Sequence, residues 1–399
     1  MPNQFSAGPQ ALGYLYQIRY ALLLLLREIR TRPDCRLTIE QLDDVAFERE
    51  GTAYELIQTK HHLDHAAALN DSSPDLWKTL RVWCVHLRDA PQGTPLPILS
   101  LITTSTADDG SATSKLREGN SRDEEGALRI LRDVAERGSN REMAPAYVAF
   151  LGLDIALQQA LISRVRVIDA TPNILDVETK IHLELTTSTK YYKRLSEGLE
   201  GWWFNRAIIN LRNSPEDTIS GQELVRQIYS LQSQLQDDNL PNDFPEFAPM
   251  DESDLPDHQR VFVEQLRLVL NNKNRLHSAI GHYYRAYRQR AKWLEDGLIF
   301  PDELEQYERN LEMEWSEQFE RMRDEMGDLP SEDEMRRLGL KLFEWANFDA
   351  QYPIRPRHVN SSFMRGTFHS LANEMRIGWH TEFQERLAHL MVAGARIAS

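Results

Sequence analysis

Hydrophobic positions in the first quarter of the chain follow two repeats, one helical and one extended. Between about residues 10 and 31, leucine and tyrosine recur three or four positions apart, which predicts a long helix that ends before Pro33. Short runs with strand-like composition come next. Three strands, a second helix and a fourth strand are expected in turn at about 36–40, 44–48, 53–59, 74–87 and 97–103. The predicted order is α-β-β-β-α-β.

The middle of the chain predicts further helices and one strand before a proline-rich linker. These elements are expected near 127–136, 164–169, 174–188, 191–213 and 220–236, the second of them being the strand. Residues 237–257 then carry four prolines among Asp, Glu and Asn. Because proline fixes φ and removes a backbone donor, this stretch cannot hold a regular element.

Beyond the linker, the helical spacing of apolar residues predicts an all-α region. One stripe covers residues 262–287 and a second covers 304–326. The expected organisation is an α/β N-terminal domain, a linker and an all-α C-terminal domain, over residues 1–240 (core about 9–105, extension 106–236), 237–257 and 258–399.

Composition places the chain among ordinary globular proteins. Its 399 residues suffice for two or three domains, and 41% are hydrophobic and 27% charged. The two cysteines, Cys35 and Cys84, do not suggest a disulfide framework. The leucine run at 22–26 is too short for a membrane span, and the first ten residues lack a basic signal-peptide region. We therefore expect a cytoplasmic protein without membrane contact.

The net charge of −15 excludes a protein whose resting role is to coat DNA, since such proteins are usually basic. Any contact with nucleic acid should use a local basic groove. It should also depend on assembly with further copies of the chain or with partners.

Candidate chemistry lies on the second and third predicted strands. Successive side chains on a strand alternate faces, so Gln58 and Lys60 point the same way. Asp44 begins the neighbouring strand. An acid and an amide oxygen can hold Mg²⁺, and a fixed lysine can stabilise developing phosphate charge. This combination predicts metal-dependent hydrolysis of phosphodiesters.

The element order with its Gln-x-Lys pair resembles the restriction-endonuclease-like, PD-(D/E)xK nuclease superfamily. Gly13-Tyr-Leu-Tyr-Gln17 and Leu56-Ile-Gln-Thr-Lys60-His-His62 are similar to effector nuclease domains of bacterial antiphage systems. The C-terminal phrases Tyr283-Tyr-Arg-Ala-Tyr-Arg-Gln-Arg290, Pro353-Ile-Arg-Pro-Arg357 and Gly378-Trp-His380 resemble the C-terminal domain of the ABC three-component group, also called Lamassu. The resemblance implies two partners, an SMC-like, Rad50-like ATPase and a small accessory subunit.

Carried over to this sequence, the superfamily's catalytic residues are Asp44, Gln58, Lys60 and Glu40. The implied metal ligands are Asp44, Gln58 and Glu40, for Mg²⁺ with Mn²⁺ as a substitute. Gln17 is a further candidate, and Asp43 ranks below Glu40. Many members carry Glu where this chain has Gln58, and an amide adds no negative charge. Metal affinity should then depend on Asp44 and Glu40.

Two functions are compatible with these patterns. The first is a Mg²⁺-dependent endonuclease for double-stranded DNA, held inactive with SMC-like partners and activated by release and assembly into a homo-oligomer. The alternative is a catalytically weak or inactive nuclease-fold module that docks DNA or organises the complex. His61, His62 and His65 lack companion cysteines, so a solvated turn or a phosphate contact is favoured over a zinc site.

Overall fold

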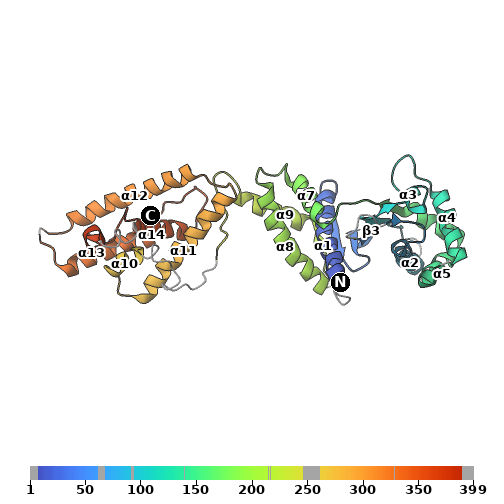
Figure 1. Cartoon of the computed structure of the whole chain (residues 1–399), viewed down its shortest axis with the longest axis horizontal. Helices are drawn as coiled ribbons and strands as arrows, with labels where there is room; N and C mark the ends of the chain where they lie inside the picture. The colour runs from blue at the N-terminus through green and yellow to red at the C-terminus, as the bar shows by residue number, and fades with distance from the viewer. Residues whose placement is uncertain are drawn as a thin grey trace, which may run out of the picture. The chain divides into compact units, whose positions relative to one another are not determined.

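The computed structural model describes residues 8–61, 68–90, 94–138, 140–213, 215, 217–245, 261–327 and 329–388. The chain forms two compact units, Met1–Gln232 and Ser233–Ser399. The first is a mixed α/β region and the second is helical (Figure 1), as the hydrophobic patterns predict. Part of the expected linker, residues 246–257, lies outside the described residues.

A six-stranded mixed sheet organises the first unit, with strand order β7-β5-β3-β2-β1-β8. Its strands in chain order are β1 (Arg36–Ile39), β2 (Val45–Arg49), β3 (Thr52–Lys60), β5 (Ile98–Thr103), β7 (Val165–Ile168) and β8 (Ile219–Ser220). Strands β1, β2 and β3 form an antiparallel meander, while β5 lies parallel to both β3 and β7. Two short strands, β4 (Ala68–Leu69) and β6 (Thr106–Ala107), pair separately.

A tight hairpin joins β2 to β3 and fixes their register. Its two loop residues, Glu50 and Gly51, have φ values of 52° and 77°. Positive φ at both loop positions is the signature of a type I′ turn, whose twist suits a hairpin. The register pairs Val45 with Ile57, and a bulge lies between Phe47 and Glu48. The residue before β2 and the last residues of β3 therefore meet at one end of the hairpin.

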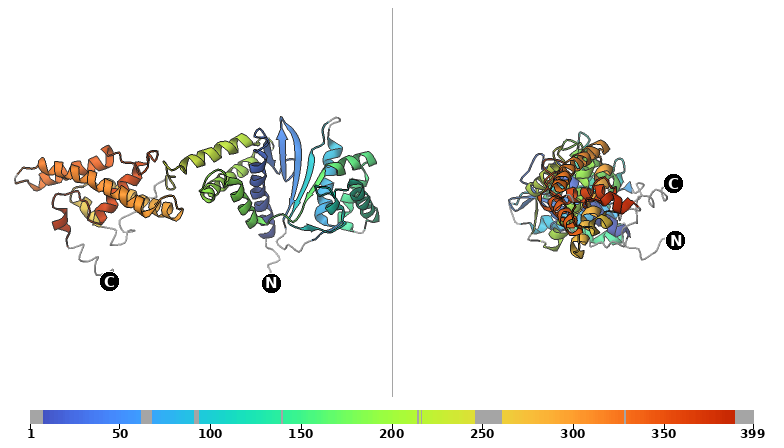
Figure 2. Two further views of the ribbon diagram at one scale, coloured as in Figure 1. Left: turned by 90° about the horizontal axis from the view of Figure 1, so that it is seen from above. Right: turned by 90° about the vertical axis from the view of Figure 1, so that its left-hand side faces the viewer.

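Helices cover both faces of the sheet (Figure 2). On one side lie α1 (Gly8–Glu28), α7 (Ile174–Leu185) and α8 (Tyr192–Arg212), and on the other α2 (Pro74–Asp89), α4 (Glu124–Arg137), α5 (Ala144–Leu151) and α6 (Ile155–Arg164). The unit also contains a 3-10 turn at Arg141–Met143, α3 (Ala112–Lys115) and α9 (Gly221–Gln234). Leu56 of β3 packs into the core on the α2 side, so Gln58 and Lys60 continue that face.

The leucine run of α1 is a buried stripe, since Leu22, Leu23, Leu25 and Leu26 are each at most 4% exposed. Among the described residues, no single helix has both the length and the apolar composition needed to cross a membrane. The bent pair Arg141–Leu151 and Ile155–Arg164, which meet at 107°, passes the same test together.

The second unit consists of α10 (Val261–Arg267), α11 (Lys273–Glu295), α12 (Pro301–Asp324), α13 (Glu332–Glu344), a π-helical turn (Trp345–Asp349) and α14 (Ser361–Asn373). The apolar stripe over 262–287 belongs to two helices and not to one continuous helix, because the chain breaks between α10 and α11. The side chain of Asn272 accepts hydrogen bonds from the backbone N–H groups of Asn274 and Arg275. This N-cap begins a new helix at the point where the apolar spacing alone indicates continuation.

Helices α14 and α11 approach each other closely at Gly366 of α14. A Cβ atom at Gly366 would lie 2.1 Å from the backbone oxygen of His282 in α11. We expect Gly366→Ala to force the two helices apart and to lower the free energy of unfolding by about 1–3 kcal/mol. Urea unfolding followed by circular dichroism measures this loss. Gly201→Ala in α8, where a Cβ meets no atom within 4 Å, is the control. Equal stability of both variants would contradict the packing argument.

Candidate functional site

Three of the predicted site residues meet at the end of the β2–β3 hairpin. The Lys60 ammonium donates to Gln58 Oε1 at 2.7 Å, and Gln58 Nε2 donates to Asp44 Oδ1 at 3.0 Å. The Lys60 Nζ atom lies 3.9 Å from Asp44 Oδ2, and the two side chains are 23% and 17% exposed. Two features bring these residues together: side chains on β3 alternate between the two faces of the sheet, and the register of β3 with β2 places Asp44 beside Gln58 and Lys60.

The orientation of the Gln58 amide follows from its neighbours. Its nitrogen donates to the carboxylates of both Asp43 and Asp44, while its oxygen accepts from Lys60. Carboxylates only accept and an ammonium only donates, so this orientation satisfies every partner. The part of the Gln58 amide that faces Asp44 is consequently the N–H donor and not the oxygen that could bind a metal ion.

Asp43 forms the buried end of this hydrogen-bond network. Its side chain is 7% exposed, and Trp83 of α2 donates from Nε1 to Asp43 Oδ2 at 2.8 Å. Burial raises the pKa of Asp43, whereas the hydrogen bonds from Gln58 and Trp83 oppose that rise. With its oxygens held by buried donors, Asp43 positions Gln58. Trp83 was not predicted as a contributor; its only signal was its place on the apolar face of the second helix.

Asp44 is held by the main chain as well as by Gln58. Its Oδ2 atom accepts from the backbone N–H of Thr59 at 2.7 Å and from Thr59 Oγ1 at 3.1 Å. Its own backbone oxygen accepts from Nε2 of Gln17 at 2.7 Å. Gln17 is 5% exposed, so it ties α1 to the site from within the core.

Glu40 lies at the edge of the cluster in a strained backbone conformation. Its φ is 56°, which is uncommon for a residue with a Cβ, and its N–H donates to the Asp44 backbone oxygen at 3.0 Å. The side chain is exposed. Even so, desolvation raises the pKa of Glu40, against a hydrogen bond from Gln17 and the charge of Lys60. Glu40 is therefore within electrostatic reach of both Asp44 and Lys60.

The oxygen donors at this site are of the kind that Mg²⁺ prefers, but they are few. Asp44 and Glu40 supply carboxylates, and the Gln58 oxygen is already bound by Lys60. Within the described ranges, no group of three or more His, Cys, Asp or Glu side chains is arranged to hold a metal ion. The ring of His61 packs on Tyr16 with centroids 4.6 Å apart, whereas His62 and His65 lie outside the described residues.

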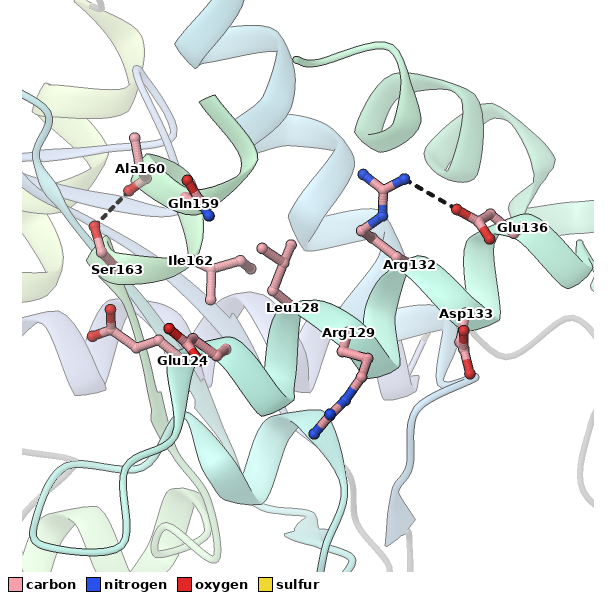
Figure 3. Close-up of a pocket in the computed structure, with 11 residues that line it drawn as sticks. Glu124, Leu128, Arg129, Arg132, Asp133, Glu136, Gln159, Ala160, Ile162 and Ser163 are labelled. Carbon is pink, nitrogen blue, oxygen red and sulfur yellow. Dashed lines mark hydrogen bonds and ion pairs between the residues drawn. The ribbon is translucent and has the colours of Figure 1, made fainter. Parts of the chain in front are cut away.

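A separate pocket of about 660 Å³ lies between α4 and α6 (Figure 3). Its walls carry both charge signs, and Arg132 pairs with Glu136 across 3.1 Å. Leu128 and Ile162 form its apolar floor. None of the predicted site residues lines this pocket, so it adds nothing to the hairpin cluster.

Residues 262–387 match the family model CTD7, described as C-terminal domain 7 of the ABC-three component (ABC-3C) systems. Comparison with curated proteins gives no match, and comparison with solved structures gives none either. The match covers most of the helical unit. It supports placing this chain among the proteins of the ABC-three component systems.

Proposed function

We propose that the chain is a Mg²⁺-dependent DNA endonuclease of a multicomponent antiphage defence system. The cluster of Asp44, Gln58 and Lys60 at the end of the β2–β3 hairpin carries this proposal. Two further observations support it. Apart from the two-residue strand β4, which pairs in the separate small sheet, the order is α1-β1-β2-β3-α2-β5 with β3 parallel to β5, the arrangement expected of a restriction-endonuclease-like core. The match to an ABC-three component domain supports a defence role.

In this proposal each side chain has a defined task. Asp44 and Glu40 would hold Mg²⁺, which supplies a polarised water and offsets phosphate charge. Lys60, fixed by Gln58 and partly desolvated, places its ammonium where charge develops on the scissile phosphate. Thr59 and Gln17 hold Asp44 in position through its side chain and its backbone oxygen.

A second candidate function is a nuclease-fold module with little or no cleavage. The orientation of Gln58 favours it, because the amide nitrogen occupies acceptor positions on both Asp43 and Asp44. Such a module would dock DNA or organise the complex. The two candidates share the fold and differ in whether Asp44 becomes free to bind a cation.

Activity on plasmid DNA distinguishes the two candidates. The purified full chain, alone and with the products of neighbouring genes, is incubated with plasmid in Mg²⁺ or in EDTA. Nicking or linearisation in Mg²⁺ that EDTA abolishes supports the nuclease. No cleavage under any of these conditions, together with DNA binding, would support the docking module instead.

Control of the enzyme is part of the same proposal. A chain with a net charge of −15 is repelled by DNA at long range. Partner subunits bound to the helical unit, an SMC-like ATPase and a small accessory subunit, would hold the chain inactive. Release and self-association would then sum weak phosphate contacts over several copies and place sites on both strands.

The substitution Gln58→Glu tests the role of the amide directly. A carboxylate here cannot donate to Asp43 and Asp44, and it adds a negative charge beside Lys60. We expect tighter Mg²⁺ binding, with cleavage reaching half its maximum at a Mg²⁺ concentration about tenfold lower. The titration follows plasmid cleavage against Mg²⁺ concentration.

A matched control is Gln41→Glu, since Gln41 lies before β2 and its side chain donates to the Asp217 backbone oxygen, away from the cluster. An unchanged Mg²⁺ requirement in Gln58→Glu would exclude this position from the metal site. A shift of equal size in Gln41→Glu would show a general charge effect only.

A further inference from the structure

A pocket of about 350 Å³ in the helical unit differs in its charge from the rest of the chain. It lies at the beginning of α14, beside the π-helical turn. None of the described residues that line it is acidic, and its one permanent charge is that of Arg365. The lining is thus positive in a chain whose net charge is −15.

Arg365 has no counter-charge within the part of the chain that the structure describes. Its buried Nε atom has no hydrogen-bond partner, and desolvation lowers the pKa of the guanidinium. The nearby arginines differ in this respect. Arg355 forms a fork with Glu303 at 2.8 and 3.0 Å, and Arg357 pairs with Asp238 at 3.6 Å. A partly buried cation without a counter-charge is costly, and a bound anion would reduce that cost.

His358 supplies a second unsatisfied group in the same pocket. The residue is 5% exposed, and its Nδ1 atom lies 3.0 Å from the backbone oxygen of Leu240. That contact places the ring proton on Nδ1. Its buried Nε2 atom has no partner, and burial lowers the pKa of the ring. Nε2 is therefore a buried and unsatisfied acceptor in the wall of the pocket.

The helix terminus adds a third element. Asn360 is the N-cap of the 13-residue helix α14, and its side chain accepts from the N–H of Ser362. Asn360 and Ser361 both line the pocket. The start of α14, with the positive end of the helix dipole, and Arg365 thus line the same pocket, a combination that favours phosphate.

The aromatic residues of the pocket indicate the shape of the rest of the occupant. Phe348, Tyr352 and Phe363 line the pocket, and the guanidinium carbon of Arg365 lies 6.0 Å from the centre of the Phe348 ring. Flat rings pack well against such walls. The volume is near the lower end of the range for ligand pockets, which suits one nucleotide and excludes larger cofactors.

We propose that this pocket binds a phosphate monoester on a flat organic body, the size of a nucleoside monophosphate. The phosphate contacts Arg365 and the start of α14. The aromatic residues cover the base. The source is either a free mononucleotide or the 5′-phosphorylated end of a nucleic-acid strand. This inference does not depend on the proposed nuclease activity.

Calorimetric titration of the full chain tests the pocket. The ligands are AMP, adenosine, inorganic phosphate, and a short oligodeoxynucleotide with and without a 5′-phosphate. We expect AMP to bind at least about tenfold more tightly than adenosine, as for loss of a charged hydrogen bond. Tight binding of AMP but not of the phosphorylated oligonucleotide identifies the free nucleotide. Stronger binding of the phosphorylated oligonucleotide than of its 5′-hydroxyl form identifies the strand end.

Variants separate this pocket from nonspecific phosphate binding. Arg365→Gln should weaken AMP binding at least about tenfold, and Arg365→Lys by less, since the charge remains without the planar fork. Arg357→Gln, which removes an exposed arginine from the same segment, should bind AMP as the wild type does. Equal affinity of Arg365→Gln and wild type would overturn the proposal. Absence of binding by every phosphate ligand at millimolar concentration would do so too, as would binding of an acidic peptide alone.

Discussion

Lys60→Ala is expected to slow Mg²⁺-dependent plasmid cleavage by about 10²- to 10³-fold without unfolding the protein. The size follows from the loss of one electrostatic contact to a transition state, which costs on the order of 3–4 kcal/mol. The Lys60 side chain is 23% exposed, and among the described residues its ammonium contacts Gln58 and, at 3.9 Å, Asp44. Its removal therefore leaves the sheet intact. Rates of plasmid nicking, measured at equal protein concentration, provide the test.

The matched control is Lys78→Ala, which removes an exposed lysine of α2 that pairs with Glu142 at 3.3 Å. This variant should cleave at the wild-type rate. Asp44→Asn is a more informative partner variant than Asp44→Ala, because an amide oxygen can still accept from Thr59. Wild-type cleavage by both Lys60→Ala and Asp44→Asn would remove the hairpin cluster from the mechanism.

Acidification from pH 7 to pH 5 is expected to destabilise the helical unit by about 4 kcal/mol. Burial lowers the pKa of His369 to about 3 and that of His282 to about 4. In the unfolded chain both rings titrate near 6.5, so between pH 7 and pH 5 the unfolded state binds protons that the native state does not bind. Stability is thus complete above pH 6.5 and falls below it, by about 2 kcal/mol for each ring at pH 5.

The structural basis is clearest for His369, which is fully buried among aromatic rings and has no hydrogen-bond partner on either ring nitrogen. His282 is held neutral mainly by burial, and the charges of Arg365 and Arg285 add to the effect. Urea unfolding at pH 7 and pH 5, followed by tryptophan fluorescence, measures the difference. Four tryptophans, Trp293, Trp315, Trp345 and Trp379, report on this unit.

The control for this prediction compares two histidine variants within the same unit. His369→Leu should lose about half of the pH sensitivity, whatever its stability at pH 7. His277→Gln, an exposed change on α11, should retain all of it. A pH dependence that is the same in His369→Leu as in the wild type would assign the acid sensitivity to other groups.

The sequence was most informative where one repeat dominated. The period of two on β3 correctly placed Gln58 and Lys60 on one face, and the period of 3.6 located α1 and α12. Two adjacent helices, α5 and α6, were not anticipated. Segment 144–151 is apolar almost all round, so it shows no stripe. Pro145 resembles a breaker in sequence, yet it occupies the first turn of α5, where proline is tolerated.

The sequence predicted which residues would form the candidate site, but not how their side chains would be oriented. Strand alternation and the resemblance to nucleases indicated which side chains would meet. They could not indicate that Gln58 presents its nitrogen to Asp44, because that orientation depends on Asp43, Lys60 and Trp83 together. Trp83 lies 40 residues beyond Asp43, on a helix whose packing no local pattern fixes. The left-handed backbone at Glu40 is likewise a tertiary outcome.

The two-residue turn at Glu50 and Gly51 also determines which genetic changes the site can survive. Asp44 and Lys60 meet because the register of the hairpin, including its bulge at Phe47 and Glu48, places the two residues at the same end. A codon inserted or deleted within β2 or β3 would turn the following side chains to the opposite face and remove Lys60 from the cluster in one step. Substitutions can alter this site gradually, but changes in length between positions 44 and 60 cannot. Descendants of this gene that keep the site should therefore vary in residue identity here while conserving the spacing.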